Sequence, residues 1–150
     1  MINLALYKPD IPQNTAAIIR LAACFKLKVH IIEPCSFNLN DSRFKRVVMD
    51  YSKYCKIIKY PDYEKFISDN LKSRIILMTT KAKKSYHSFK FKKNDILLFG
   101  RESAGVPEKI HKNSKIKLKI PINNKTRSLN VAITAAMVVS ISLQKLNFFK

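Results

Sequence analysis

The sequence predicts an α/β fold built on a mostly parallel sheet with helices on both faces. Short apolar runs rich in Ile, Leu and Val alternate with segments that carry helix signals along the whole chain. Strands that are apolar throughout are typical of a parallel sheet covered on both faces. The length of 150 residues and the 47% hydrophobic share predict a single domain over residues 1–150 with a sizeable core.

The apolar runs define the strands. Each run is bounded by polar or turn-forming residues, which is the usual signature of a buried strand. Pro34 ends the second run, because proline lacks the N–H group that a strand interior needs. The polar, basic stretch 81–94 is expected to be a connection. We expect strands over residues 2–7, 28–34, 55–60, 74–80, 95–100 and 116–122.

The segments between the strands carry helix signals. Asn14 and Asp41 are expected to cap the first two helices, and Pro61 suits the first turn of the third. Thr126 and Ser128 are both candidates for the cap of the last helix. We expect helices over residues 14–27, 41–51, 61–72, 107–113 and 127–146.

The last helix contains the stretch VAITAAMVV, which is apolar on all faces. A helix of this kind needs burial on all faces. The nearly uncharged run from residue 131 to residue 143 is too short to span a bilayer, and no signal peptide is recognisable at the start. We expect no membrane association.

The formal net charge of +19 has two explanations. One is a polyanionic partner, most simply nucleic acid. The other is an AT-rich coding sequence, which favours Lys, Ile and Asn and depletes Gly, Arg and Trp. Under the second explanation the few arginines become informative, because the chain uses them where a planar guanidinium fork matters.

The sequence also excludes several kinds of site. The three cysteines are odd in number and lack CxxC spacing, which predicts reduced thiols in a cytoplasmic protein with no disulfide and no metal site. Neither GxGxxG nor GxxxxGK[ST] occurs, so the glycine-rich nucleotide-binding loops are missing.

Both glycines of the chain, Gly100 and Gly105, lie in the stretch LLFGRESAGVP. A chain of this length and average composition has roughly ten glycines. The stretch follows a buried strand, and ligands of parallel sheets bind at the carboxyl ends of the strands. A ligand packed against the backbone of Gly100 is one explanation, and an ordinary tight turn is the other.

Three further stretches carry polar groups in an apolar setting. Arg20 is the only charged residue from Asn14 to Phe25, so its guanidinium either binds a carboxylate or phosphate or extends to the surface. LMTTK ends a buried strand in two hydroxyls and a lysine. IPINNKTRSLNVA runs from a strand through a polar loop into the last helix.

Together these motifs resemble the SPOUT RNA 2′-O-methyltransferases. PDIPQNT, IIR, IIEP, MDY, TTK, LLFGRESAGVP and IPINNKTRSLNVA occur in that family's order and spacing. The match is closest to the TrmL/YibK group, which methylates the wobble nucleotide, position 34, a cytidine or modified uridine, of leucine tRNAs. The resemblance implies a homodimer, tRNA as the partner and a deep C-terminal trefoil knot, although knots are rare.

The resemblance also implies site residues. S-adenosylmethionine would contact Met78, Gly100, Ile120, Ser128, Leu129 and Asn130. The catalytic residues would be Asn14, Arg20, Glu102 and Asn130. Arg20 would bind the substrate. Because no separate RNA-binding domain fits in 150 residues, the basic surface would hold the tRNA, and the candidates for this are Lys81, Lys83, Lys84, Arg43 and Arg46. For each lysine a solvated surface position is at least as good an explanation. Arg20 is a poor base, because its pKa exceeds about 12, so we expect it to bind the adjacent phosphate and to position the ribose hydroxyl. No histidine lies in a motif.

One motif departs from the family pattern, which usually reads NTGN where this chain has Asn14-Thr15-Ala16-Ala17. Two other interpretations stay open. One is a SPOUT methyltransferase acting on another tRNA or ribosomal RNA site. The other is a non-catalytic basic RNA-binding protein, which would bind no S-adenosylmethionine.

Overall fold

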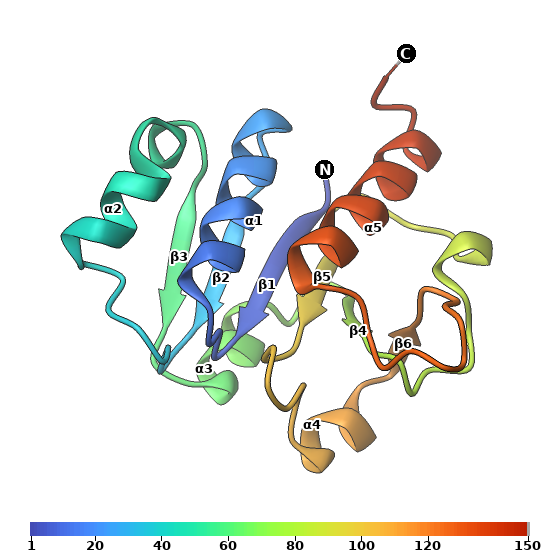
Figure 1. Ribbon diagram of the computed structural model, residues 1–150. Helices are drawn as coiled ribbons and strands as arrows, with labels where there is room; N and C mark the ends of the chain where they lie inside the picture. The colour runs from blue at the N-terminus through green and yellow to red at the C-terminus, as the bar shows by residue number, and fades with distance from the viewer. Residues whose placement is uncertain (150) are drawn as a thin grey trace.

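The computed structural model describes residues 1–149, apart from the side chains of residues 49 and 50, which belong to the MDY motif. Six strands form one sheet in the order β3-β2-β1-β5-β4-β6, and all neighbouring pairs are parallel (Figure 1). Each strand falls within one of the six expected runs, which confirms the predicted parallel α/β sheet. The strands are β1 (Asn3–Tyr7), β2 (Val29–Ile32), β3 (Ile57–Tyr60), β4 (Ile75–Met78), β5 (Ile96–Phe99) and β6 (Ile116–Leu118).

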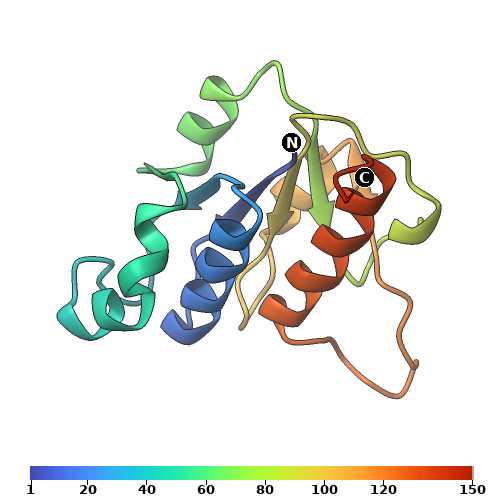
Figure 2. The same ribbon diagram turned by 90° about the horizontal axis from the view of Figure 1, so that it is seen from above.

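Helices cover both faces of the sheet, as predicted (Figure 2). On one face lie α1 (Pro12–Cys24), α2 (Ser42–Val48) and α5 (Val131–Lys145); on the other lie α3 (Tyr63–Asp69) and α4 (Glu108–Asn113). Two 3₁₀ helices, η1 (Met49–Lys53) and η2 (Tyr86–Ser88), lie in connections. Each face has its own apolar core, with Ile18 and Val138 in one and Phe66 and Ile110 in the other.

The beginnings of two helices differ from expectation. The predicted cap Asn14 is wrong, because α1 begins two residues earlier at Pro12, and Ile11 before it offers no capping side chain. The cap of α5 is neither Thr126 nor Ser128. It is Asn130, whose Oδ1 accepts the N–H groups of residues 132 and 133.

The two shorter helices on the N-terminal side are capped by aspartates. Asp41 Oδ1 accepts the backbone N–H groups of Arg43 and Phe44, which confirms its expected place at the start of α2. In α3 the cap is Asp62, which accepts from the N–H of residue 65, so Pro61 precedes the helix and is not in its first turn. An aspartate at the N-cap satisfies an N–H that proline at the same place would leave unpaired.

The strand register brings four loops to one edge of the sheet. Phe99 pairs with Leu6 of β1 and with Met78 of β4, and Met78 pairs with Leu118 of β6. These residues stand at or next to the carboxyl ends of their strands. The segments that follow β1, β4, β5 and β6 therefore begin side by side, which is the usual place for a ligand in a parallel sheet.

The chain after β6 runs beside the connection after β4. The backbone N–H of Lys119 donates to the carbonyl of Lys84, and the N–H of Tyr86 donates to the carbonyl of Lys119. These contacts join two of the expected cofactor loops. The trefoil knot itself stays a prediction.

The last helix is not buried on all faces within one chain, so the complete burial expected from its sequence would need a second subunit. Ala135, Val138 and Val139 are fully buried, whereas Ile133 is 54% and Met137 is 37% exposed. One apolar face of α5 is thus left uncovered beside α1.

Candidate active site

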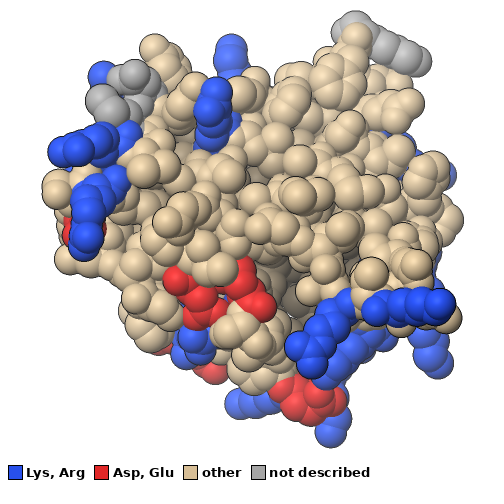
Figure 3. All heavy atoms as spheres, in the orientation of Figure 1, with Lys and Arg blue, Asp and Glu red and all other residues tan. Residues whose placement is uncertain are grey.

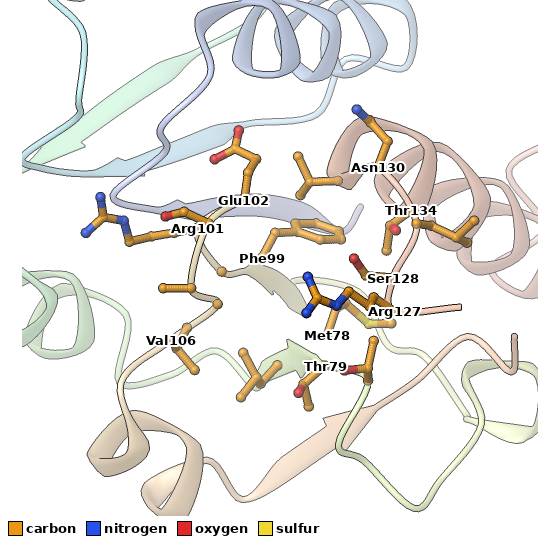
Figure 4. Close-up of a pocket in the computed structure, with 18 of the residues that line it drawn as sticks. Met78, Thr79, Phe99, Arg101, Glu102, Val106, Arg127, Ser128, Asn130 and Thr134 are labelled. Atoms are coloured by element: carbon orange, nitrogen blue, oxygen red, sulfur yellow. The ribbon is translucent and has the colours of Figure 1, made fainter. Parts of the chain in front are cut away.

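A cavity of about 510 Å³ lies at the carboxyl ends of β4 and β5 (Figure 4). Its walls come from four places: the start of α1, the segment after β4, the loop between β5 and α4, and the segment from residue 120 into α5. Its volume falls in the range of about 300–1,000 Å³ that is typical of small-molecule sites.

Most of the residues predicted from the sequence meet in this cavity. Arg20, Arg43 and Arg46 do not line it. Arg20 instead lies on the exposed side of α1, with its guanidinium 4.9 Å from the centre of the Tyr51 ring. The predicted residues that line the cavity are Asn14, Met78, Lys81, Gly100, Glu102, Ile120, Ser128, Leu129 and Asn130.

Glu102 ties the loop after β5 to the start of α1. Its Oε2 accepts from the backbone N–H of Asp10 at 2.8 Å, and its Oε1 accepts from the N–H of Ile11 at 3.3 Å. The first N–H groups of a helix lack partners within the helix and attract negative charge. Glu102 therefore does for α1 what a capping side chain usually does, from 91 residues away along the chain.

Asn14 continues this connection to the last helix. Its Nδ2 donates to Glu102 Oε1 at 3.3 Å, and its Oδ1 accepts from Asn130 Nδ2 at 2.9 Å. The other side-chain atom of Asn130, Oδ1, caps α5. A single line of hydrogen bonds thus joins three wall segments of the cavity, and each amide has its orientation set by both neighbours.

Asp10 makes a second connection, which the sequence reasoning missed. Its Oδ1 accepts from Arg101 Nη2 at 2.5 Å and from Ser36 Oγ at 2.8 Å, and its Oδ2 accepts from Ser103 Oγ at 2.6 Å. The hydrogen bond from Arg101, followed by that from Ser103, holds the pKa of Asp10 well below its usual range. Asp10 is therefore ionised at neutral pH and fixes the loop that carries Glu102.

The two glycines form this loop by packing on each other. Arg101 and Gly105 exchange two backbone hydrogen bonds of 2.9 and 2.8 Å, and Gly105 adopts a φ of +66°. A Cβ at Gly100 would lie 2.6 Å from the carbonyl carbon of Gly105 and 2.7 Å from its Cα. Of the two explanations for Gly100, the tight turn therefore accounts for the missing side chain, because the close neighbour is the protein's own backbone.

The cavity combines apolar walls with basic groups. Met78, Phe99 and Ile120 supply apolar surface. Three basic side chains that were not predicted as site residues also line it, namely Arg101, described above, Arg127 and His111. Arg127 comes from the segment before α5, and His111 comes from α4, with its Nε2 3.5 Å from Thr79 Oγ1. His111 lies between the motifs, and only the folding of α4 against the end of β4 brings it here.

Comparison with known proteins decides the family. The model of the SpoU rRNA methylase family matches residues 1–140. The chain belongs to the SpoU methylase family. It is 42% identical over 144 residues to the tRNA (cytidine(34)-2′-O)-methyltransferase of Beijerinckia indica, covering 95% of this chain and 90% of that protein. It is 33% identical over 150 residues to the enzyme of the same name from Escherichia coli K12, covering 99% and 96%.

Two solved structures share the fold. A structure concerned with 2-OH methylation of C/U34 on tRNA superimposes with a TM-score of 0.93 at 30% identity, covering 98% of this chain and 97% of that one. An AdoMet-bound rRNA methyltransferase from Sinorhizobium meliloti gives 0.86 at 21% identity, covering 97% and 56%. The second likeness supports the SPOUT fold alone.

Within residues 1–149, no helix is long and apolar enough to cross a membrane, and no group of three His, Cys, Asp or Glu side chains could hold a metal ion. Burial raises the pKa of the Cys35 and Cys55 thiols to about 11, so neither forms a thiolate nucleophile at neutral pH.

Proposed function

We propose that this protein transfers a methyl group from S-adenosylmethionine to the ribose 2′-hydroxyl of nucleotide 34, a cytidine or uridine, in leucine tRNAs. The observation that carries the proposal is the meeting of Asn14, Glu102 and Asn130 at one cavity, tied by hydrogen bonds. The relatives named for this reaction match nearly the whole chain, which supports the same substrate.

The cavity suits S-adenosylmethionine by shape and by chemistry. Met78, Ile120 and Leu129 offer apolar surface to an adenosine, and they lie in the same cavity as the ends of β4 and β5. When bound, the cofactor supplies a methyl group on a positively charged sulfur. The residues expected to hold it are Met78, Gly100, Ile120, Ser128, Leu129 and Asn130.

The chain's part in the reaction is to position the ribose and to exclude water. Proximity and orientation can account for much of the acceleration of such a transfer. Asn14 and Asn130 hold the wall segments in register, and Glu102 keeps its carboxylate beside them. The exposed lysines 81, 83 and 84 follow β4 next to the cavity, where they can bind the RNA backbone.

A homodimer belongs to the proposal. Ile11, Ile133 and Met137 are exposed and lie at the start of α1 and on α5, two helices that pack side by side. Figure 3 shows an uncharged area on this face, bordered by a group of acidic side chains near the middle of the view and by basic side chains at its edges. A second copy of the chain would cover the exposed apolar side chains. Arg20, which lies on α1 outside the cavity, would then serve the second subunit's site, and Arg43 and Arg46 on α2 would hold tRNA.

The proposal is tested with purified protein at neutral pH and moderate salt, which are the conditions of the cytoplasm where we expect the protein to act. Leucine tRNA and S-adenosylmethionine are mixed with the protein, and 2′-O-methyl groups are mapped by nucleotide. Methylation confined to nucleotide 34 supports the proposal. If the protein binds the cofactor, as heat released on mixing would show, but methylates another nucleotide, it is a SPOUT enzyme that acts on a different RNA site.

A further inference from the structure

The charged side chains in the cavity wall differ in whether they have hydrogen-bond or ion-pair partners within the protein. Among the described lining residues the one carboxylate is that of Glu102, which already accepts three hydrogen bonds. Arg101 is paired with Asp10. The guanidinium of Arg127, by contrast, has no hydrogen-bond or ion-pair partner among residues 1–149. Figure 4 shows its side chain reaching from the segment before α5 toward the middle of the cavity.

The backbone on both sides of Arg127 is anchored. Asn123 accepts hydrogen bonds from the hydroxyl and N–H of Thr126 and, through Oδ1, from the N–H of Lys125. Three residues after Arg127, Asn130 caps α5 and bonds Asn14. The arginine therefore sits on a short, fixed stretch and its position over the cavity is set by the fold.

The presence of arginine and not lysine at position 127 is informative. The chain has 29 basic side chains, of which six are arginine. Arg74 pairs with Asp95, Arg101 with Asp10 and Arg43 with Asp41. In the first two pairs two guanidinium nitrogens reach one carboxylate, a fork that a lysine does not have. Arg127 has the same fork and no oxyanion within the chain.

We propose that Arg127 binds an oxyanion of the bound substrates, as a binding residue that has not been assigned in this site. The inference rests on the proposed function, which supplies two such groups: the phosphodiester next to the target ribose and the carboxylate of S-adenosylmethionine.

The test uses Arg127→Gln, which removes the charge, and Arg127→Lys, which keeps the charge without the fork. Lys125→Gln is the matched control, since Lys125 is exposed on the same segment and does not line the cavity. Thermal midpoints are measured for all variants. Affinity is measured by calorimetry for S-adenosylmethionine and for its decarboxylated analogue, and by anisotropy for leucine tRNA over a salt series.

If the oxyanion is the phosphodiester, Arg127→Gln lowers tRNA affinity at least tenfold and reduces the salt slope by about 0.7, while cofactor affinity is unchanged. If it is the carboxylate, the Arg127→Gln variant binds S-adenosylmethionine at least tenfold more weakly than wild type. Its affinity for the decarboxylated analogue then equals that of wild type. In both cases Arg127→Lys is intermediate and Lys125→Gln changes either affinity less than twofold. The proposal is overturned if Arg127→Gln binds both ligands within twofold of wild type.

The same experiment separates this inference from the proposed function. Wild-type protein that binds both ligands without methylating nucleotide 34 would defeat the proposed function, while the Arg127 comparison still stands. Wild-type protein that binds neither ligand would defeat both.

Discussion

Replacing Gly100 with alanine is the smallest change that tests how the cavity is built. The new Cβ would lie 2.6 Å from the carbonyl carbon of Gly105, and ordinary contacts begin at 3.4 Å. The Gly105 backbone would have to retreat by about 0.8 Å. Such a shift breaks the two backbone hydrogen bonds between Arg101 and Gly105, which are worth about 1 kcal/mol each.

We therefore expect Gly100→Ala to lower the free energy of unfolding by about 2 kcal/mol, the usual cost of overpacking. For a chain of this length that corresponds to a fall of roughly 4–8 °C in the thermal midpoint. Because the same loop carries Glu102 and walls the cavity, affinity for S-adenosylmethionine should fall at least tenfold, or about 1.4 kcal/mol. Differential scanning fluorimetry and calorimetric titration measure the two quantities.

Gly105→Ala is the matched comparison. Its Cβ would meet nothing within 4 Å, but the residue adopts a φ of +66°. The cost is backbone strain of roughly 1–2 kcal/mol, with the walls left in place, so cofactor affinity should change less than for Gly100→Ala. A Gly100→Ala protein with the wild-type midpoint and wild-type affinity would refute the packing explanation of this loop.

Three further predictions concern other parts of the molecule. Asp10→Asn removes the anion that holds Arg101, so cofactor affinity should fall severalfold and unfolding free energy by about 1–2 kcal/mol; equal affinity in variant and wild type would exclude a positioning role. His30 is 4% exposed, and burial, followed by the nearby Lys28 charge, lowers its pKa from 6.5 to about 4. Between these values the unfolded chain binds a proton that the folded one does not, so stability should fall by roughly 3 kcal/mol from pH 6.5 to pH 4. Denaturant titrations of His30→Asn should lack this share of the pH dependence, and an identical pH profile would contradict it. Met137→Lys places a charge on the exposed face of α5 and should yield a monomer in light scattering, whereas a dimer of undiminished mass would place the subunit contact elsewhere.

The parts of the fold that depend on local patterns were predictable. All six strands follow from apolar runs, and Asp41 follows from the ordinary preference of aspartate for an N-cap. The start of α5 was missed although its cap, Asn130, is a local signal, and the start of α1 was missed for a long-range reason. Asn14 looks like a cap by its local sequence, but its side chain is used by Glu102 and Asn130, which approach only after the sheet has formed.

The functional site was also predictable only where it depends on local sequence patterns. Nine of the residues expected from the motifs line one cavity. The chemical roles of these residues stay predictions. The reason for Gly100 was not visible in the sequence, because it depends on how closely the backbone of Gly105 approaches. His111 and Arg127 were missed as cavity residues, since their positions depend on how α4 and the segment before α5 fold back over the strand ends.

The central claim is that this cavity directs methyl transfer to one ribose. The most direct test maps the 2′-O-methyl groups that the wild-type protein and the Arg20→Lys variant add to tRNA. Purified protein, S-adenosylmethionine and leucine tRNA are incubated, and 2′-O-methylation is quantified at every nucleotide under single-turnover conditions. The account predicts methylation at nucleotide 34 by wild type. In Arg20→Lys the account predicts a steep loss of that signal, because Arg20 is proposed to position the ribose in the second subunit's site. Cofactor affinity should stay unchanged, because Arg20 lies outside the cavity of its own chain. No methylation at nucleotide 34 by a folded wild-type protein that binds both ligands would contradict the claim.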